Sequence, residues 1–207
     1  MDYKDKFKNQ IKPENIHKLS VSFLIDELKK EKWWTWLNIA YNLALLWEKS
    51  ILLSWIWKDF EFWDYIEKNI NLKHIHRSEN LLSSSWYITN DLDWNQITAF
   101  YPWSMNESDK ISIKNINEII SYAIVSPNKK ETMFLHLNEL KIMWIKTFFD
   151  PWQAIFWMNK IDLLEAMNLA DYLIVNDYEF DLFKDKIWLE KKEIISWFKK
   201  IIITMWE

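Results

Sequence analysis

The sequence predicts an α/β protein: a doubly wound, mostly parallel β-sheet with helices on both faces, plus a small β lid. The first observation is a regular pattern after residue 113, in which short apolar runs alternate with amphipathic stretches. Such runs are typical of strands buried on both faces of a parallel sheet. Strands are therefore expected at about 122–126, 145–149, 171–175 and 200–204, with helices between them.

The second observation is a hairpin pattern earlier in the chain. Residues 84–90 and 95–101 alternate in polarity on either side of the turn-like 91–94, and this pairing is typical of two antiparallel strands. Residues 17–24 alternate in the same way, so we expect a strand there beside the hairpin. These strands would form the lid.

Residues 37–46 carry apolar side chains at helical spacing, with Asn38 and Asn42 on another side, and predict a buried helix. A strand at 49–54 and a helix at 58–69 would follow and form a βα unit. In doubly wound sheets, ligands bind beyond the carboxyl ends of the strands. The segments predicted at that edge are 54–57, 126–128, 150–153, 176–179 and 204–206.

Composition excludes several classes of protein. Half of the 207 residues are apolar and the net charge is −4, so the basic face of a nucleic-acid-binding protein is not expected. There is no cysteine, which excludes disulfides and zinc-thiolate sites. No apolar run approaches the roughly 18 residues of a membrane span, and the charged N-terminus is unlike a signal peptide. A cytoplasmic protein with no membrane partner is the default expectation.

One feature of the composition is physically improbable. The chain has 16 tryptophans and no glycine, whereas glycine normally takes roughly 7% of a globular chain. Only glycine adopts a positive φ without a Cβ penalty. The tryptophans also stand where glycine is expected: Trp47 at a helix end, Trp94 in the hairpin turn, and Trp103 and Trp152 after prolines, where type II turns are expected. We therefore hypothesise that the gene uses UGA as a glycine codon and that it has been translated here as tryptophan.

With glycine restored, residues 33–38 read Gly-Gly-Thr-Gly-Leu-Asn. This segment resembles the first signature of the ribokinase/PfkB family of sugar and nucleoside kinases. Residues 176–179, Asn-Asp-Tyr-Glu, resemble that family's N-x-x-E motif, and 204–207 resemble the end of its T-x-G strand. More narrowly, 17–24, 95–102 and Asp150-Pro151 with Gln153 are similar to bacterial, mycobacterial-type adenosine kinases.

The resemblance implies a ribokinase-like fold and an ATP- and Mg²⁺-dependent transfer of a phosphoryl group to the 5′-hydroxyl of a nucleoside, with adenosine as the first candidate. A single kinase domain would fill 1–207, with the lid from about 7–32 and 84–104 and the α/β core from about 33–83 and 105–207. The implied substrate-binding residues are Ser22, Trp33, Trp34, Asn38, Phe100 and Gln153. The implied ATP-binding residues are Asn176, Glu179, Thr204 and Trp206, and Glu179 would also hold magnesium through water.

The resemblance also implies missing parts. The family's first-strand aspartate would precede Met1, and its G-A-G-D motif, with the catalytic base, would lie beyond Glu207. The chain is thus expected to be truncated at both ends and inactive as a kinase, although its full-length form would dimerise through the lid.

Several alternatives stay open. Asn176 and Glu179 have the spacing of a helix capping box. His74 and His76 have a spacing that can bind a metal, although no carboxylate or cysteine is nearby in the sequence. Ala154 and Trp86 depart from the adenosine-kinase pattern, which leaves other nucleosides or ribose-type sugars possible. Two further classes are a Trp-rich binding module and a non-catalytic interaction protein.

Overall fold

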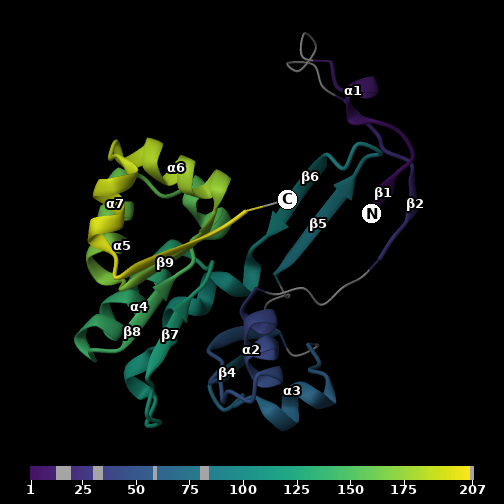
Figure 1. Cartoon of the computed structure of the whole chain (residues 1–207). Helices are drawn as coiled ribbons and strands as arrows, with labels where there is room; N and C mark the ends of the chain where they lie inside the picture. Colours follow the sequence, from purple (N-terminus) through teal and green to yellow (C-terminus); the bar gives the residue numbers. More distant parts are fainter. Residues whose placement is uncertain (13–19, 30–34, 58–59, 80–83, 206–207) are drawn as a thin grey trace.

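The computed structural model describes residues 1–12, 20–29, 35–57, 60–79 and 84–205 (Figure 1). The strands are β1 Asp2–Tyr3, β2 Ile25–Glu27, β3 Ser54–Trp57, β4 Ile75–Ser78, β5 Ser85–Asn90, β6 Gln96–Tyr101, β7 Tyr122–Val125, β8 Lys146–Phe149, β9 Tyr172–Asn176 and β10 Lys200–Thr204. The helices are α1 Phe7–Gln10, α2 Thr35–Leu45, α3 Asp64–Asn69, α4 Lys130–Ile142, α5 Lys160–Leu169, α6 Asp177–Ile187 and α7 Lys191–Trp197, and 3-10 helices cover Trp103–Lys110, Ile113–Asn115 and Trp152–Phe156.

The largest unit is a parallel sheet of four strands in the order β10-β9-β8-β7. All four strands lie within one or two residues of the predicted ranges, so the predicted α/β pattern is confirmed. Each strand joins the next through a helical crossover, α4 after β7, α5 after β8, and α6 with α7 after β9 (Figure 1). Because the strands run in parallel, all of their carboxyl ends meet at one edge of the sheet.

The core of this unit lies between one face of the sheet and the helices. Phe149 and Leu173 point from the strands into it and are fully buried. Leu137 of α4, Leu163 of α5 and Phe183 of α6 meet them from the helical side and are also inaccessible to water. Burying side chains of this size stabilises each by roughly 1.5–3 kcal/mol relative to exposure.

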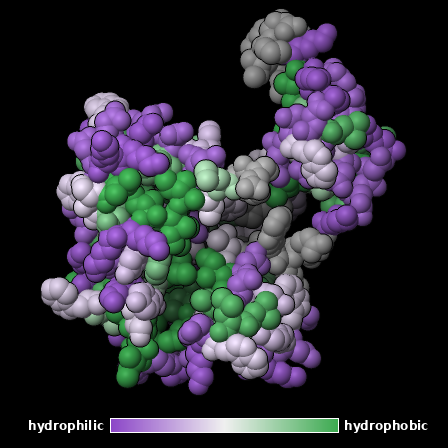
Figure 2. Space-filling view, viewed as in Figure 1, coloured by the Kyte–Doolittle hydropathy of each residue, from purple (hydrophilic) through white to green (hydrophobic). Residues whose placement is uncertain are grey.

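The opposite face of the same sheet is less covered. Ile124 of β7 and Ile202 of β10 are 38% and 37% exposed. Between them, the rings of Phe148 and Tyr172 stack with their centroids 4.3 Å apart, and Tyr122 continues the aromatic row. Figure 2 shows hydrophobic surface over this part of the molecule. An apolar sheet face of this kind is normally covered by another element or chain.

A smaller unit contains α2, α3 and the parallel pair β3–β4, which lie beside the large sheet in Figure 1. Leu37, Ala40 and Ala44 of α2 form its buried stripe, as the helical spacing predicted. The strand predicted at 49–54 is wrong in position, because β3 begins only at Ser54 and Ile51 makes a single bridge to Asn71.

The helix predicted at 58–69 is also shorter than expected. Residues 58–59 lie outside the described ranges, and α3 begins at Asp64. The residue before it, Trp63, is extended (φ −76°, ψ 150°), so the helix cannot reach further back. Phe60 precedes the helix and fills the small core, where it is buried and its ring centroid lies 5.0 Å from that of Phe62.

The lid is a four-stranded sheet in the order β2-β1-β5-β6. The hairpin β5–β6 is confirmed, with Ser85 opposite Tyr101 and Asn90 opposite Gln96. The strand predicted at 17–24 is not found: 13–19 lie outside the described residues, and 20–24 are not in a strand. Among the described residues, β1 pairs with β5 of the hairpin instead, and β2 pairs with the other side of β1.

Aromatic packing explains this difference at the N-terminal side of the lid. The ring of Phe23 packs against those of Tyr3 and Phe7 at 4.9 and 5.0 Å. The alternation of polarity around Phe23 therefore reflects this aromatic cluster rather than a ladder of strand hydrogen bonds. Within the described residues, none of the helices has the length and apolar character needed to cross a membrane.

Among the described residues, positive φ angles occur just after helices, in the turn of the lid hairpin and at the start of the 3-10 helix Trp152–Phe156. The expectation of a glycine-like conformation is confirmed at Trp47 (φ 65°) and Trp94 (φ 61°). The type II turns predicted at the two proline positions are wrong, because Pro102 (ψ −5°) and Pro151 (ψ −26°) are helical and each begins a 3-10 helix. Trp152 nevertheless has a positive φ of 35°.

Candidate functional site

Polar side chains gather where the strands of the large sheet end. Asp150 follows β8 directly, and its backbone N–H donates to the carbonyl of Val125 at the end of β7 (3.0 Å). Asn176 ends β9, and Thr204 ends β10 directly opposite it in the parallel register. The structure thus brings together residues that are up to 54 positions apart in the sequence, at the edge where doubly wound folds bind ligands.

Asn176 and Glu179 form a reciprocal capping box at the start of α6. The Asn176 side-chain oxygen accepts from the Glu179 backbone N–H (2.7 Å), and Glu179 Oε2 accepts from the Asn176 backbone N–H (2.8 Å). The capping alternative is therefore confirmed as geometry. It also fixes the Glu179 carboxylate, which is only 6% exposed, beside the end of β8 and β9.

Asp150 and Glu179 are electrostatically coupled. The pKa of Asp150 is raised to about 7, mainly by burial and also by the negative charge of Glu179, while a hydrogen bond from the backbone N–H of Trp152 acts in the opposite direction. Burial also raises the pKa of Glu179, while its hydrogen bond from the Asn176 backbone lowers it. Two carboxyl groups with raised pKa values at one sheet edge form a site that favours a proton or a cation.

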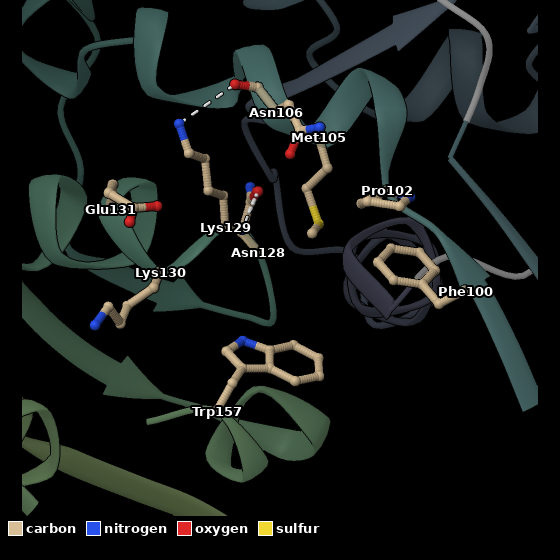
Figure 3. Close-up of a pocket in the computed structure, with 9 residues that line it drawn as sticks. All are labelled: Phe100, Pro102, Met105, Asn106, Asn128, Lys129, Lys130, Glu131 and Trp157. Carbon is tan, nitrogen blue, oxygen red and sulfur yellow. Dashed lines mark hydrogen bonds between the residues drawn. The ribbon is translucent and has the colours of Figure 1, made fainter. Parts of the chain in front are cut away.

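A cleft of about 390 Å³ lies between the lid and the large sheet (Figure 3). Phe100 and Pro102 reach it from the end of β6, Met105 comes from the following 3-10 helix, and Trp157 lies across from them. Its polar side comes from Asn106 of the same 3-10 helix and from residues at the start of α4, which are Asn128, Lys129, Lys130 and Glu131. Apolar walls with a few polar groups on one side are typical of small-molecule sites.

A buried hydroxyl holds the polar side of the cleft in place. Ser108 is only 3% exposed, and its Oγ lies 2.8 Å from Asn128 Oδ1, 2.7 Å from Thr132 Oγ1 and 2.6 Å from the Met105 carbonyl. Asn128 Oδ1 also accepts from the Lys129 backbone N–H at 2.7 Å. Because its oxygen is held in this way, the Asn128 amide group has one orientation in the cleft.

The two lysines beside the cleft form ion pairs. Lys129 Nζ lies 3.0 Å from Asp109, and Lys130 Nζ lies 3.2 Å from Asp162. The second pair joins α4 to the N-terminus of α5, where Asp162 also closes a capping box with Asn159. The Lys130–Asp162 ion pair therefore fixes the start of α4 relative to the start of α5.

The predicted site residues fall into three groups. Asn176, Glu179 and Thr204 come together at the sheet edge, and Phe100 lines the cleft. Asn38 is half-buried in the first turns of α2, and Ser22 is exposed outside any strand. Gln153 lies in the 3-10 helix after Asp150. Trp33, Trp34 and Trp206 lie outside the described residues.

Sequence reasoning missed the roles of Asp150, Asn128 and Ser108. Asp150 and Asn128 each follow a predicted strand end, which was the available signal. Ser108 carries no signal in the sequence, because its role depends on a loop that folds against α4.

The paired histidines do not form a metal site here. His74 contacts Glu118 at 3.3 Å, and His76 stacks on Trp55. Within the described ranges no group of three or more metal-binding side chains occurs.

No protein-family model matches the chain. A nucleoside kinase from Methanocaldococcus jannaschii is 27% identical over 174 residues, which cover 81% of this chain and 56% of that relative. The structure of Burkholderia thailandensis nucleoside kinase in ligand-free form is 31% identical, with a TM-score of 0.76 over 99% of this chain and 68% of that one. The same enzyme in complex with inosine is 28% identical, with a TM-score of 0.86 over 99% of this chain and 65% of that one.

The α/β sheet, the β lid and the polar residues at the strand ends define a protein of ribokinase fold. The chain belongs to the ribokinase family, and the relatives described above are nucleoside kinases. It spans 56% of the length of the curated relative and about two thirds of the solved structures.

Proposed function

We propose that this protein is a cytoplasmic, ATP-dependent kinase that transfers a phosphoryl group to the 5′-hydroxyl of a nucleoside, with adenosine as the first candidate. The terminal phosphoryl group of ATP would pass to the hydroxyl oxygen, the hydroxyl proton would be lost, and ADP would leave. Phosphoryl transfer depends mainly on positioning and on neutralising charge. These are properties of a sheet edge at which helix N-termini and polar side chains meet.

The observation that carries this proposal is the joint placement of two sites. Asn176, Glu179 and Thr204 lie at the ends of β9 and β10, and the α6 N-terminus is well suited to phosphate oxygens. The apolar cleft with Phe100 lies beside the lid hairpin. We propose that the cleft receives the nucleoside and that the sheet edge receives the phosphates. Ser22, Asn38, Gln153 and positions 33, 34 and 206 would complete these two sites.

Magnesium fits the chemistry of the sheet edge. Asp150 and Glu179 offer carboxylate oxygens, the ligands that Mg²⁺ prefers, and burial raises the pKa of both groups, so a bound cation would stabilise their charged forms. Mg²⁺ usually takes one or two carboxylates and completes its shell with water and substrate phosphates. When bound, it would neutralise phosphate charge. We propose that Glu179 holds it through water, with Asp150 as its neighbour.

Substrate choice is the finer part of the proposal. The Burkholderia thailandensis relative binds inosine, and a second structure of it holds ADP and inosine. A purine nucleoside fits a cleft with an aromatic wall and an oriented amide, since stacking and hydrogen bonding together select a base. Adenosine is our first choice and inosine its closest competitor. Ribose, which lacks a base, would leave the apolar wall of the cleft uncovered.

We further propose that residues 1–207 alone lack kinase activity. The resemblance to the family implies a G-A-G-D motif with the catalytic base, and residues 1–207 contain no such sequence even with glycine restored. The uncovered apolar face around Phe148 and Tyr172 agrees with a larger folded protein.

We also propose that the lid mediates homodimerisation, because Tyr87 and Ile97 of its hairpin are 57% and 39% exposed.

A binding and activity panel tests the proposal. We expect the glycine-restored, full-length protein to phosphorylate adenosine with Mg-ATP, and its melting temperature to rise with adenosine more than with ribose. Residues 1–207 should show no turnover in the same assay. A melting shift with ribose alone would overturn the nucleoside assignment, and a shift with inosine but not adenosine would move it to inosine. Turnover by residues 1–207 would disprove their inactivity, and a monomeric mass in light scattering would disprove the dimer.

A further inference from the structure

Every positive φ in the described residues belongs to a tryptophan. The five residues with this conformation are Trp47 (65°), Trp94 (61°), Trp144 (58°), Trp152 (35°) and Trp188 (59°). Asparagine and aspartate are the residues that normally follow glycine in this region of backbone space, and the chain is rich in both. None of them adopts it in the described part of the chain. A bulky aromatic residue has no intrinsic preference for this conformation.

The ends of α2 and α4 have the hydrogen bonds of the Schellman motif. After α2, the Trp47 N–H donates to the Ala44 carbonyl (3.1 Å) and the Glu48 N–H donates to the Leu43 carbonyl (2.9 Å). After α4, the Trp144 N–H donates to the Lys141 carbonyl (3.2 Å) and the Ile145 N–H to the Leu140 carbonyl (3.0 Å). In both motifs, tryptophan occupies the left-handed position that is usually glycine.

Two further turns repeat the pattern with other geometries. After α6, the Trp188 N–H donates to the Lys184 carbonyl (2.9 Å), the single bond of the simpler left-handed cap. In the lid hairpin, the Trp94 N–H donates to the Asp91 carbonyl (3.1 Å), and the Asp91 N–H donates to the Asn95 carbonyl (3.0 Å). This is a three-residue loop in which the third residue is left-handed, again a glycine position.

The indole rings contribute little at four of these positions. Trp47, Trp94, Trp144 and Trp188 are 95%, 85%, 93% and 80% exposed. A residue that accepts a backbone penalty normally gains something from its side chain, such as burial or a ligand contact. These four rings lie mostly in water, although Lys160 lies over the ring of Trp188 at 4.2 Å. The residue type that suits these four positions is therefore determined by the backbone conformation and not by contacts of the side chain.

We infer that the protein made in its own cell carries glycine at the tryptophan positions, because its genetic code reads UGA as glycine. Backbone geometry assigns five of the sixteen positions, and the absence of any glycine in 207 residues extends the assignment to the rest. The inference is independent of the proposed function, since none of the five residues on which it rests lines the cleft.

The codons and the native protein test the inference directly. We expect the sixteen codons to be UGA, and peptides of the protein purified from its own cells to have the mass of glycine at these positions by tandem mass spectrometry. UGG codons, or peptides with the mass of tryptophan, would overturn it. Kinase activity plays no part in either measurement, so failure of the proposed function would leave this result unaffected.

Substitution in the chain tests the backbone argument separately. Trp144→Gly should be more stable than Trp144→Ala, with a folded-to-unfolded ratio about 5- to 30-fold higher, because only alanine carries the left-handed Cβ penalty. Trp197 is the control, since it is an exposed tryptophan that is still helical, at the last residue of α7. At that helical position, Trp197→Gly should be less stable than Trp197→Ala. Equal stability of the two Trp144 variants would contradict the assignment of that turn.

Discussion

The carboxylate of Glu179 lies close enough to Asp150 to help raise the pKa of Asp150 to about 7, well above the 3.8 of an ordinary aspartate. These two residues leave adjacent strands at the carboxyl edge of the sheet, and Glu179 is held there by its capping box with Asn176. The Glu179 side chain thus caps helix α6 and also belongs to the carboxylate pair at the sheet edge. The two roles predict different outcomes for different substitutions.

Asp150 should make the stability of the protein depend on pH. Its pKa is higher in the folded state than in the unfolded state, so the folded protein retains a proton that the unfolded chain loses between about pH 4 and 7. The free energy of unfolding should therefore fall as pH rises through this range and then level off. Asp150→Asn should remove this loss, on the order of 2 kcal/mol at pH 8 after allowance for partial solvent exposure.

Urea unfolding of the two proteins at several pH values measures this effect. Asp177→Asn is the matched control, because Asp177 is an exposed carboxylate at the same helix entrance. A parallel pH dependence in the parent protein and in Asp150→Asn would show that Asp150 does not titrate in this way.

The capping box predicts a stability change at Asn176. Asn176→Ala removes the oxygen that accepts from the Glu179 backbone N–H, and losses at such caps are typically about 1 kcal/mol. Asn176→Asp retains an acceptor and should recover most of this stability. Denaturant titration at neutral pH measures both variants, and equal stability of alanine and asparagine at this position would contradict the observed geometry.

Substitution of Glu179 separates the cap from the proposed magnesium role. Glu179→Gln retains a side-chain oxygen for the Asn176 backbone N–H, so stability should change by less than about 1 kcal/mol. The loss of negative charge should lower kcat of the full-length, glycine-restored protein by at least about tenfold and weaken its dependence on Mg²⁺. Unchanged kcat and Mg²⁺ dependence would leave Glu179 with the capping role alone.

Phe100 should contribute to nucleoside binding. Removal of a ring that stacks on a base typically costs about 1–3 kcal/mol, so Phe100→Ala should raise the KM for the nucleoside by roughly 5- to 150-fold. The KM for ATP should change little, because the phosphates are proposed to bind at the sheet edge. Ile97→Ala on the same strand is the control, and an equal effect of both variants would indicate general damage to the lid.

Ser108 should stabilise the polar side of the cleft. Ser108→Ala leaves Thr132 and Asn128 without the buried hydroxyl that joins them, which should cost about 1–3 kcal/mol in the free energy of unfolding. Ser112→Ala is a useful comparison, because its hydroxyl contacts Glu139 outside the cleft. Nucleoside binding should weaken in the Ser108 variant and not in the Ser112 variant. Calorimetric titration measures this difference, and equal binding by both would disprove the role.

Local sequence was sufficient for the parallel strands of the large sheet and for the hairpin. Tyr172 to Val175 is apolar throughout because Leu173 and Val175 face the helical core, while Tyr172 stacks on Phe148 on the other face. The hairpin was readable from the alternation of 84–90 and 95–101 on either side of a turn. The capping box was also readable, since it needs only Asn176 and Glu179 three positions apart. The strand predicted at 17–24 failed because alternation around Phe23 arises from aromatic packing.

By itself, the sequence determined the α/β class, the order of the strands along the chain and the anomaly of sixteen tryptophans without glycine. These follow from periodicity and composition, which are local properties. Only the tertiary structure decided that Asp150 lies beside Glu179 and that Ser108 holds Asn128. It also decided that, in the part of the chain that the structure describes, every residue with a positive φ is a tryptophan. Charge coupling and backbone angles depend on distances in space, and those distances exist only once the chain has folded.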